Sequence, residues 1–366
     1  MQDSTEFGID ALPYGVFSRG GARRVGVRYG HSIVDVATVA ATLDPPLGAF
    51  FDQPNLDAFL SASRPIWTRA REVVRQWIVE RPNDVAQHSH DLSTVQLHLP
   101  FTVSDYVDFY SSREHAENVS QIFRPSQPGL QPNWLRLPVG YHGRAGTVVA
   151  SGTPVKRPCG QYASPSDPAQ SLFGSSTRFD VEVELGFVVG MPSTPGVPVP
   201  TSKFEDHVFG VVVLNDWSAR DLQGYETVPL GPHLGKSFAT SIGHWVTPLD
   251  ALREARVAPP PREVAVHKYL ISAQPWGLDV KFVLTVNKTP LSAPRFSSMY
   301  WTADQQLAHM TINGARLRTG DLYGSGTVSS VSPNAFGSLL EITRNGAEPV
   351  QLRDLTTRGF LLDGDE

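Results

Sequence analysis

Cysteine is almost missing from this sequence, because Cys159 is the only one among 366 residues. A single thiol cannot close an internal disulfide, and it cannot supply the cysteine ligands of a structural zinc site. The sequence therefore favours a reducing compartment, and the cytoplasm fits best.

An excess of positive charge is also missing. Lysine and arginine total 31 against 36 aspartates and glutamates, so the formal net charge is -5. General affinity for nucleic acid needs cations that neutralise phosphates. We therefore expect no nucleic-acid partner.

Long hydrophobic runs do not occur either. The longest, such as residues 208–214, have the length of a strand, and the first fifteen residues lack a basic segment followed by an apolar one. A membrane helix needs about 18 apolar residues. The sequence predicts no membrane partner and no secretion signal.

Glycine and proline are abundant, with 31 and 30 residues, while charged residues make up only 18%. This composition argues against a helical bundle. At about 150 residues per domain, the length suggests two domains or one large one. We place a small domain at residues 1–100 and a larger one at residues 101–366.

The predicted elements are mainly short strands. In the first domain, residues 67–79 carry apolar side chains at helical spacing, with Pro65 in the expected first turn. From residue 97 onward, short apolar runs alternate with turn-rich connections, which is typical of a mainly antiparallel β architecture. Residues 161–178 are predicted to form a long loop. The fold class is thus mainly β, of the α+β type.

A strand predicted over residues 179–189 carries three acids. Alternation places Asp180, Glu182 and Glu184 on one face, with neighbouring carboxylates about 6–7 Å apart. A solvated polar face on an edge strand is the competing interpretation. The apolar residues that follow favour a strand running into a core, where two acids would share one site.

Two further acids lie near apolar segments. Asp216 directly follows the run at 208–214, and Asp108 lies in an aromatic stretch, although Asp105 is equally plausible there. Acids at strand ends either cap the next turn or bind hard cations such as Mg²⁺ and Ca²⁺. The pattern alone leaves both interpretations open.

Cations and amides gather just after Asp216. Arg220, Gln223 and Lys236 lie among turn-forming residues, as expected of a site that stabilises an oxyanion beside a metal. Surface ion pairing is the alternative, and it stays the favoured interpretation for Asp221. The glycines before Lys236 are separated by three residues and a proline intervenes, which excludes a phosphate-binding P-loop.

His115 lies seven residues beyond Asp108. Histidine suits general-base catalysis near neutral pH when a carboxylate or carbonyl holds its other nitrogen. A lone histidine is more often a surface residue or a satisfied core residue, and the local sequence does not decide between these.

Six longer motifs go beyond such local patterns. They are DYVDFYSSREHAENV, LPVGYHGRAGTVVASGTPVKRP, NDWSARDLQGYE, VPLGPHLGKSF, MYWTADQQLAHMTING and SGTVSS. In this order, and over nearly the whole chain, the sequence resembles the fumarylacetoacetase family. The resemblance implies a small SH3-like N-terminal β domain, a larger C-terminal domain with a β-roll-type core, and a homodimer.

The resemblance also implies an activity and residue roles. The activity is hydrolysis of a carbon–carbon bond in 4-fumarylacetoacetate, giving fumarate and acetoacetate, in the last step of tyrosine and phenylalanine breakdown. Mg²⁺ and/or Ca²⁺ would be the cofactor.

The implied metal ligands are Asp108, Glu182, Glu184 and Asp216, with Lys236 and Thr240 at an additional Mg²⁺ position. The implied catalytic residues are His115, held by Glu341, and the oxyanion group Arg220, Gln223 and Lys236. The implied substrate contacts are Tyr110, Arg124 and Thr327.

Two departures from the family pattern stand out. Thr227 occupies a position where the family commonly has tyrosine, and Tyr225 is a candidate substitute. The chain also stops where the family continues into further strands, so the C-terminal domain is expected to be truncated at its end. Other diketo-acid hydrolases of the superfamily, of the acylpyruvate type, and a catalytically silent homologue are the alternatives.

Overall fold

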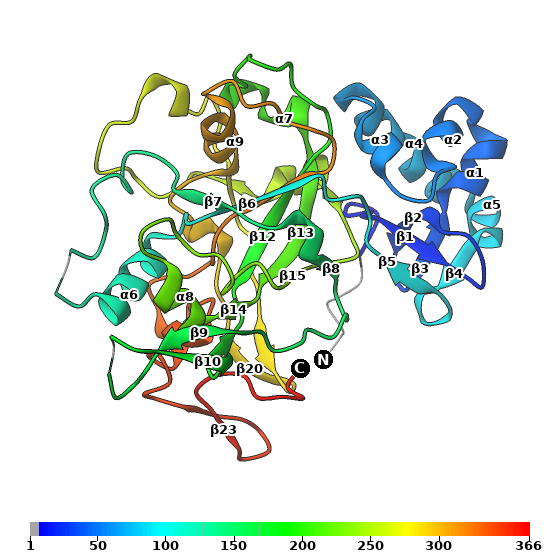
Figure 1. The fold of residues 1–366 in the computed structure, drawn as a ribbon. Helices are drawn as coiled ribbons and strands as arrows, with labels where there is room; N and C mark the ends of the chain where they lie inside the picture. The colour runs from blue at the N-terminus through cyan, green and yellow to red at the C-terminus, as the bar shows by residue number, and fades with distance from the viewer. Residues whose placement is uncertain (1–6, 127, 168) are drawn as a thin grey trace.

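The structure, a computed structural model, describes residues 7–126, 128–167 and 169–366. It has two units, a small N-terminal one and a larger C-terminal one (Figure 1). The small unit contains an antiparallel five-stranded sheet in the order β4-β3-β2-β1-β5. Its strands are β1 (Tyr14–Ser18), β2 (Arg24–Tyr29), β3 (Ser32–Asp35), β4 (Ser89–Asp91) and β5 (Gln96–His98).

Helices accompany this sheet (Figure 1). They are α1 (Val36–Leu43), α2 (Pro45–Phe51), α3 (Asp57–Leu60), α4 (Arg64–Glu80) and α5 (Pro82–Gln87). Helix α4 confirms the helix predicted from apolar spacing. Its Trp67 packs edge-on against Phe209 of the large unit at a ring-centroid distance of 5.4 Å. The two units therefore share a hydrophobic core.

The large unit is built on a mixed eight-stranded sheet with the order β7-β6-β21-β12-β13-β15-β8, and β16 pairs beside β13. Its strands are β6 (Asp105–Phe109), β7 (Gly140–His142), β8 (Val148–Ala150), β12 (Val183–Val189), β13 (Val208–Asp216), β15 (Thr240–Ile242), β16 (Thr247–Pro248) and β21 (Asp321–Gly324). Two pairs, β21 with β6 and β15 with β8, are parallel, and the other pairs are antiparallel. The mainly antiparallel prediction is confirmed.

Shorter elements surround this sheet. The helices are α6 (Arg113–Phe123), α7 (Phe204–His207), α8 (Arg220–Glu226), α9 (Ala303–Thr311) and α10 (Leu339–Ile342). Two-residue to five-residue strands pair as β9 (Cys159–Ala163) with β10 (Ser171–Ser175), β11 (Phe179–Asp180) with β14 (Ser218–Ala219), β17 (Arg256–Val257) with β18 (Gly277–Leu278), β19 (Leu284–Val286) with β20 (Thr289–Ser292), and β22 (Val350–Gln351) with β23 (Thr357–Arg358). Short 3₁₀ segments cover Leu92–Thr94, Ala145–Thr147, Thr201–Lys203, Leu249–Ala255, Lys268–Leu270, Phe296–Ser298 and Pro333–Ala335.

The long loop predicted over residues 161–178 is wrong in part, because β9 and β10 form a hairpin there. Most of the hairpin is exposed, including Phe173 at 78%, so it shows none of the apolar alternation that marks a strand. Pairing and contact with α8 hold it instead.

Strand β12 positions the site because both of its faces are covered. Val188 packs into the core shared with the small unit, whereas Phe187 and Val189 pack into a second core that includes Leu307 of α9. Acids at the start of such a strand cannot turn toward water. No helix in the described part of the chain combines the length and the apolarity that crossing a bilayer requires.

Candidate active site

Four carboxylates meet at one end of the central sheet. Asp108 lies near the end of β6, Glu184 lies in β12, Glu182 precedes β12, and Asp216 ends β13. Each offers an oxygen, and these oxygens all lie within 4.8 Å of one another. All four side chains are buried. Strand pairing places them together although they come from three separate stretches of sequence.

Two glycines make room for this convergence. A Cβ atom on Gly324 would lie 2.7 Å from Glu184 Oε2 and 2.8 Å from Asp108 Oδ1, which is too close for either oxygen. The backbone N–H of Gly326 donates to Glu184 Oε2 at 3.0 Å. Sequence reasoning missed both roles, although the glycines lie beside and within the SGTVSS motif.

The cluster is electrostatically suited to a cation. Burial, and then the neighbouring Asp216, raises the pKa of Asp108 well above its usual range. Burial, and then Asp108, does the same to the pKa of Glu184. Buried carboxylates this close repel one another unless a positive charge lies between them.

The donor atoms also fit a hard cation. Asp108 Oδ1 and Glu184 Oε1 are buried and accept no hydrogen bond from the residues that the structure describes. A buried acceptor without a partner is costly. An all-oxygen set of carboxylates is the chemistry that Mg²⁺ and Ca²⁺ prefer. The residues present therefore fit such an ion.

Two buried cations border the cluster. Lys236 Nζ forms ion pairs with both Glu182 and Asp216. Arg220 Nη1 contacts Glu182 Oε1 at 2.6 Å and donates to Gln223 Oε1 at 3.1 Å. Burial alone would raise the pKa of Glu182, but Lys236 and then Arg220 hold it far below its usual value. Glu182 thus stays ionised between them.

His115 also lies near Glu182. Ser112 begins helix α6 by accepting a hydrogen bond from the His115 backbone N–H at 3.2 Å. The buried imidazole places Nδ1 2.8 Å from Glu341 Oε2, while Nε2 lies 4.0 Å from Glu182 Oε1.

The Glu341 carboxylate is itself held firmly. Asn118 Nδ2 donates to it at 2.9 Å, Ser329 Oγ at 2.9 Å and Ser338 Oγ at 2.8 Å. Burial would raise the pKa of Glu341, but His115 and these donors lower it below the ordinary value. An ionised Glu341 keeps the proton of the neutral imidazole on Nδ1 and leaves Nε2 able to accept one. Asn118 had no signal in the sequence, because an asparagine in a helix is unremarkable.

The remaining predicted site residues differ in how closely they contact the carboxylates and His115. Thr240 Oγ1 donates to Asp216 Oδ1 at 3.3 Å. The Tyr110 ring lies edge-on to His115 with centroids 5.3 Å apart. Thr327 is buried next to Gly326, whereas Arg124 is exposed at the C-terminal end of α6.

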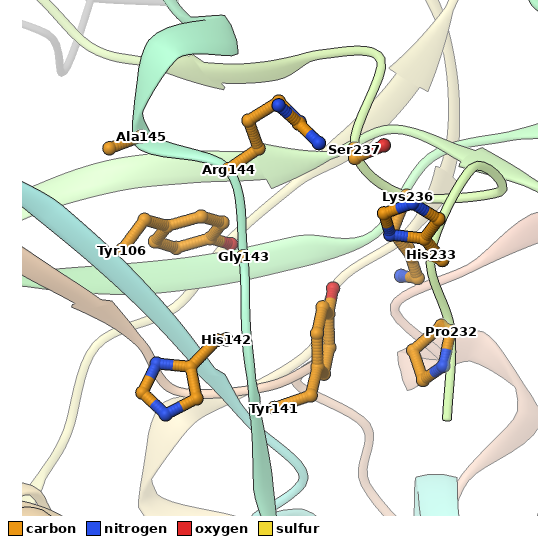
Figure 2. Close-up of a pocket in the computed structure, with 10 residues that line it drawn as sticks. All are labelled: Tyr106, Tyr141, His142, Gly143, Arg144, Ala145, Pro232, His233, Lys236 and Ser237. Atoms are coloured by element: carbon orange, nitrogen blue, oxygen red, sulfur yellow. The ribbon is translucent and has the colours of Figure 1, made fainter. Parts of the chain in front are cut away.

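Tyr141 was missed by sequence reasoning. It lies on β7, and its hydroxyl donates to Asp216 Oδ2 at 3.1 Å. Beside it, a cavity of about 270 Å³ opens next to Lys236 (Figure 2). The cavity is lined by Tyr106, Tyr141, His142, Gly143, Arg144, Ala145, Pro232, His233, Lys236 and Ser237.

Three acids named from the sequence lie outside the cluster. Asp180 belongs to β11, pairs with Arg220 Nε at 2.8 Å and accepts backbone N–H groups from α10, because the strand is interrupted before Glu182. Asp105 contacts Arg318 at 3.2 Å, so Asp108 is the acid that faces the site. Asp221 accepts from the Ser176 hydroxyl at 2.6 Å instead of forming the expected surface ion pair.

Thr227, the residue at which the sequence departs from the expected pattern, lies at the C-terminal end of α8. Its hydroxyl donates to the carbonyl of Gln223 at 2.5 Å, so this hydrogen bond holds the side chain against the last turn of α8. Tyr225 is 44% exposed on the same helix.

Two protein-family models match this chain, and one of them covers all the residues of the site. Residues 105–366 match the model described as fumarylacetoacetate (FAA) hydrolase C-terminal, and residues 10–100 match the model described as fumarylacetoacetase N-terminal. The chain belongs to the fumarylacetoacetase family.

Individual members of this family are similar in sequence to this chain over its whole length. The chain is 41% identical to fumarylacetoacetase from Homo sapiens over 385 residues, which covers 100% of this chain and 92% of that protein. It is 43% identical to the protein of the same name from Caenorhabditis elegans over 386 residues, again covering 100% and 92%. A solved fumarylacetoacetate hydrolase from Exiguobacterium antarcticum has a TM-score of 0.57 at 16% identity, covering 97% of this chain and 93% of that one, and shows the shared fold.

Proposed function

We propose that this member of the fumarylacetoacetase family hydrolyses 4-fumarylacetoacetate to fumarate and acetoacetate. The chain is an enzyme of the hydrolase class, as its identity of about 40% to fumarylacetoacetases over its full length indicates. The single observation that carries the proposal is the buried group of four carboxylates with an imidazole next to it. This arrangement would bring a cation site and a general base together at one end of the central sheet.

The proposed cofactor is Mg²⁺ and/or Ca²⁺, held by Asp108, Glu182, Glu184 and Asp216. Lys236 and Thr240, which both contact Asp216, are proposed for an additional Mg²⁺ position. These residues would hold such a cation, which would supply Lewis-acid polarisation of the diketone substrate.

The residues of the chain supply the proton transfers. His115 Nε2 takes a proton from water, and the resulting hydroxide adds to the carbonyl carbon next to the scissile carbon–carbon bond. Glu341 keeps the imidazole oriented and stabilises the imidazolium that forms. His115 then returns the proton to the acetoacetate carbon when the bond breaks.

The oxyanion formed by this addition needs donors nearby. Arg220, Gln223 and Lys236 are proposed to supply them, since Arg220 bonds to Gln223 and both cations contact Glu182. Collapse of the tetrahedral species breaks the carbon–carbon bond, and the electron pair leaves as the enolate of acetoacetate. Tyr110, Arg124 and Thr327 are proposed to contact the acetoacetate part of the substrate.

Further proposals concern the organisation of the protein. We place the boundary between the units at residue 100, which is supported by the ranges 10–100 and 105–366 of the two family matches. A homodimer and a cytoplasmic location are also proposed, the latter because the only cysteine is free.

A comparison of substrates tests the proposed function. The purified chain with Mg²⁺ or Ca²⁺ is expected to convert 4-fumarylacetoacetate into equal amounts of fumarate and acetoacetate. Its kcat/KM on an acylpyruvate is expected to be at least about 100-fold lower, because the donors of a site built for one polar substrate stay unpaired with another. Preference for the acylpyruvate would assign the chain to another diketo-acid hydrolase, and no cleavage of either would indicate a silent homologue.

A further inference from the structure

The cavity beside Lys236 has two walls from distant parts of the sequence (Figure 2). One wall is the segment 142–145, which begins at the last residue of β7, and the other is the segment 232–237. At about 270 Å³, the cavity is slightly smaller than typical small-molecule sites, which begin at about 300 Å³. Its size suits one short arm of a substrate.

The first wall is fixed against the sheet. A Cβ atom on Gly143 would lie 2.2 Å from Cδ1 of Tyr106, so the chain passes directly over that ring only because residue 143 is glycine. The carbonyl of Arg144 accepts from the backbone N–H and from the hydroxyl of Thr147, both at 3.1 Å. The backbone that carries the Arg144 side chain is therefore held in place.

The second wall is fixed as well. Glu226 accepts hydrogen bonds from the backbone N–H groups of His233 and Gly235, each at 2.7 Å. The Thr147 hydroxyl also lies 2.8 Å from the carbonyl of Ser237, so it shares its proton between the two walls. The cavity is thus preformed rather than assembled by a ligand.

The charge of the lining is positive. It contains the cationic side chains of Arg144 and Lys236, and it contains no aspartate or glutamate among the residues that the structure describes. Lys236 is already neutralised by Glu182 and Asp216. The guanidinium of Arg144 has no ion pair with any described carboxylate. In Figure 2 it extends from the first wall toward Ser237 on the second.

We propose that Arg144 binds the carboxylate on the fumaryl arm of the substrate, in this cavity. The inference rests on the proposed function and deepens it. The attacked carbonyl carbon carries the fumaryl arm, and Lys236, one of its proposed oxyanion donors, lines the cavity. The arm attached to that carbon therefore enters here, while the acetoacetate end lies toward Tyr110 and Arg124. A guanidinium facing a planar carboxylate is the pairing that gives strong, geometrically specific recognition.

The test is Arg144→Gln assayed on two substrates. The first is 4-fumarylacetoacetate, and the second is 3,5-dioxohexanoate, which keeps the diketone and the acetoacetate end but has a methyl group in place of the fumaryl arm. The variant is expected to lose about 10- to 100-fold in kcat/KM on the first substrate, as for loss of a hydrogen bond to a charged group. The loss on the second is expected to be less than about 2-fold.

Product inhibition gives an independent readout. The inhibition constant of fumarate is expected to rise by a similar 10- to 100-fold in Arg144→Gln, and that of acetoacetate to stay within about 2-fold. Arg144→Lys, which keeps the charge but loses the paired geometry, is expected to recover part of the fumarate binding. The matched control is Arg23→Gln, the same change at an exposed position of the small unit, and it should behave as wild type.

The outcomes separate this inference from the proposed function. Wild-type protein that cleaves neither diketone would overturn the proposed function. Wild-type protein that is active, with an Arg144→Gln variant unchanged on both substrates or weakened equally on both, would overturn the role of Arg144 alone.

Discussion

His115→Ala is expected to lower kcat on 4-fumarylacetoacetate by about 10² to 10⁴ and to leave KM largely unchanged. The imidazole is buried, is oriented by Glu341 at 2.8 Å and lies 4.0 Å from the carboxylate cluster through its free nitrogen. In the proposed mechanism it serves proton transfer and does not supply charge that binds the substrate. Steady-state kinetics on the purified variant measures both effects.

Two further variants serve as comparisons for His115→Ala. Glu341→Gln keeps the shape but removes the charge that orients the imidazole, so a smaller loss of kcat is expected than for His115→Ala. His267→Ala, at an exposed histidine outside the site, should leave kcat unchanged. A His115→Ala enzyme that turns over within a few-fold of wild type would remove His115 from the mechanism.

Glu184→Gln is expected to abolish cation binding and, with it, turnover. The substitution keeps the size of the side chain but removes one of four carboxylates whose oxygens lie within 4.8 Å of one another. Loss of a direct ligand should weaken binding by more than the roughly 10- to 100-fold that loss of an outer partner costs. Titration calorimetry with Mg²⁺ and with Ca²⁺ measures the affinity.

Thermal unfolding provides a second measurement on the same variant. At a free ion concentration of about 100 times Kd, the wild-type protein gains about 2.7 kcal/mol of stability, because the ion binds the folded state. Glu184→Gln should fold without added ion, since one repulsive charge is gone, yet its melting temperature should not respond to the ion. Glu348→Gln, the same change at an exposed glutamate, should respond like wild type. An unaltered ion response in Glu184→Gln would contradict the assignment of the cluster as the cation site.

Local patterns in the sequence predicted some of these features and not others. Helix α4 is encoded by neighbouring residues, and it was found where expected. The α+β class also followed from turn-rich composition. Alternation was a poorer guide for Asp180, because a break in the strand before Glu182 turns it to Arg220, outside the cluster.

The site itself depends on strand register, which local patterns do not contain. Local patterns made Asp105 and Asp108 equal candidates, whereas the family resemblance pointed to Asp108, and the pairing of β6 with β21 sets Asp108 opposite Gly324. Asn118 and Tyr141 are recognised as site residues only from their hydrogen bonds in the structure, to Glu341 and Asp216 respectively. The resemblance to the family supplied residue positions, but it could not show which cation of the Lys236 cavity lacks a carboxylate partner.

The most direct measurement is the loss of the diketone absorbance of 4-fumarylacetoacetate in the presence of this chain, with and without a chelator. We expect rapid loss with Mg²⁺ or Ca²⁺, none above background after chelation, and recovery when the ion is restored. Persistent absorbance under all three conditions, or cleavage that chelation does not slow, would contradict the claim that a carboxylate-bound cation and His115 together hydrolyse this substrate.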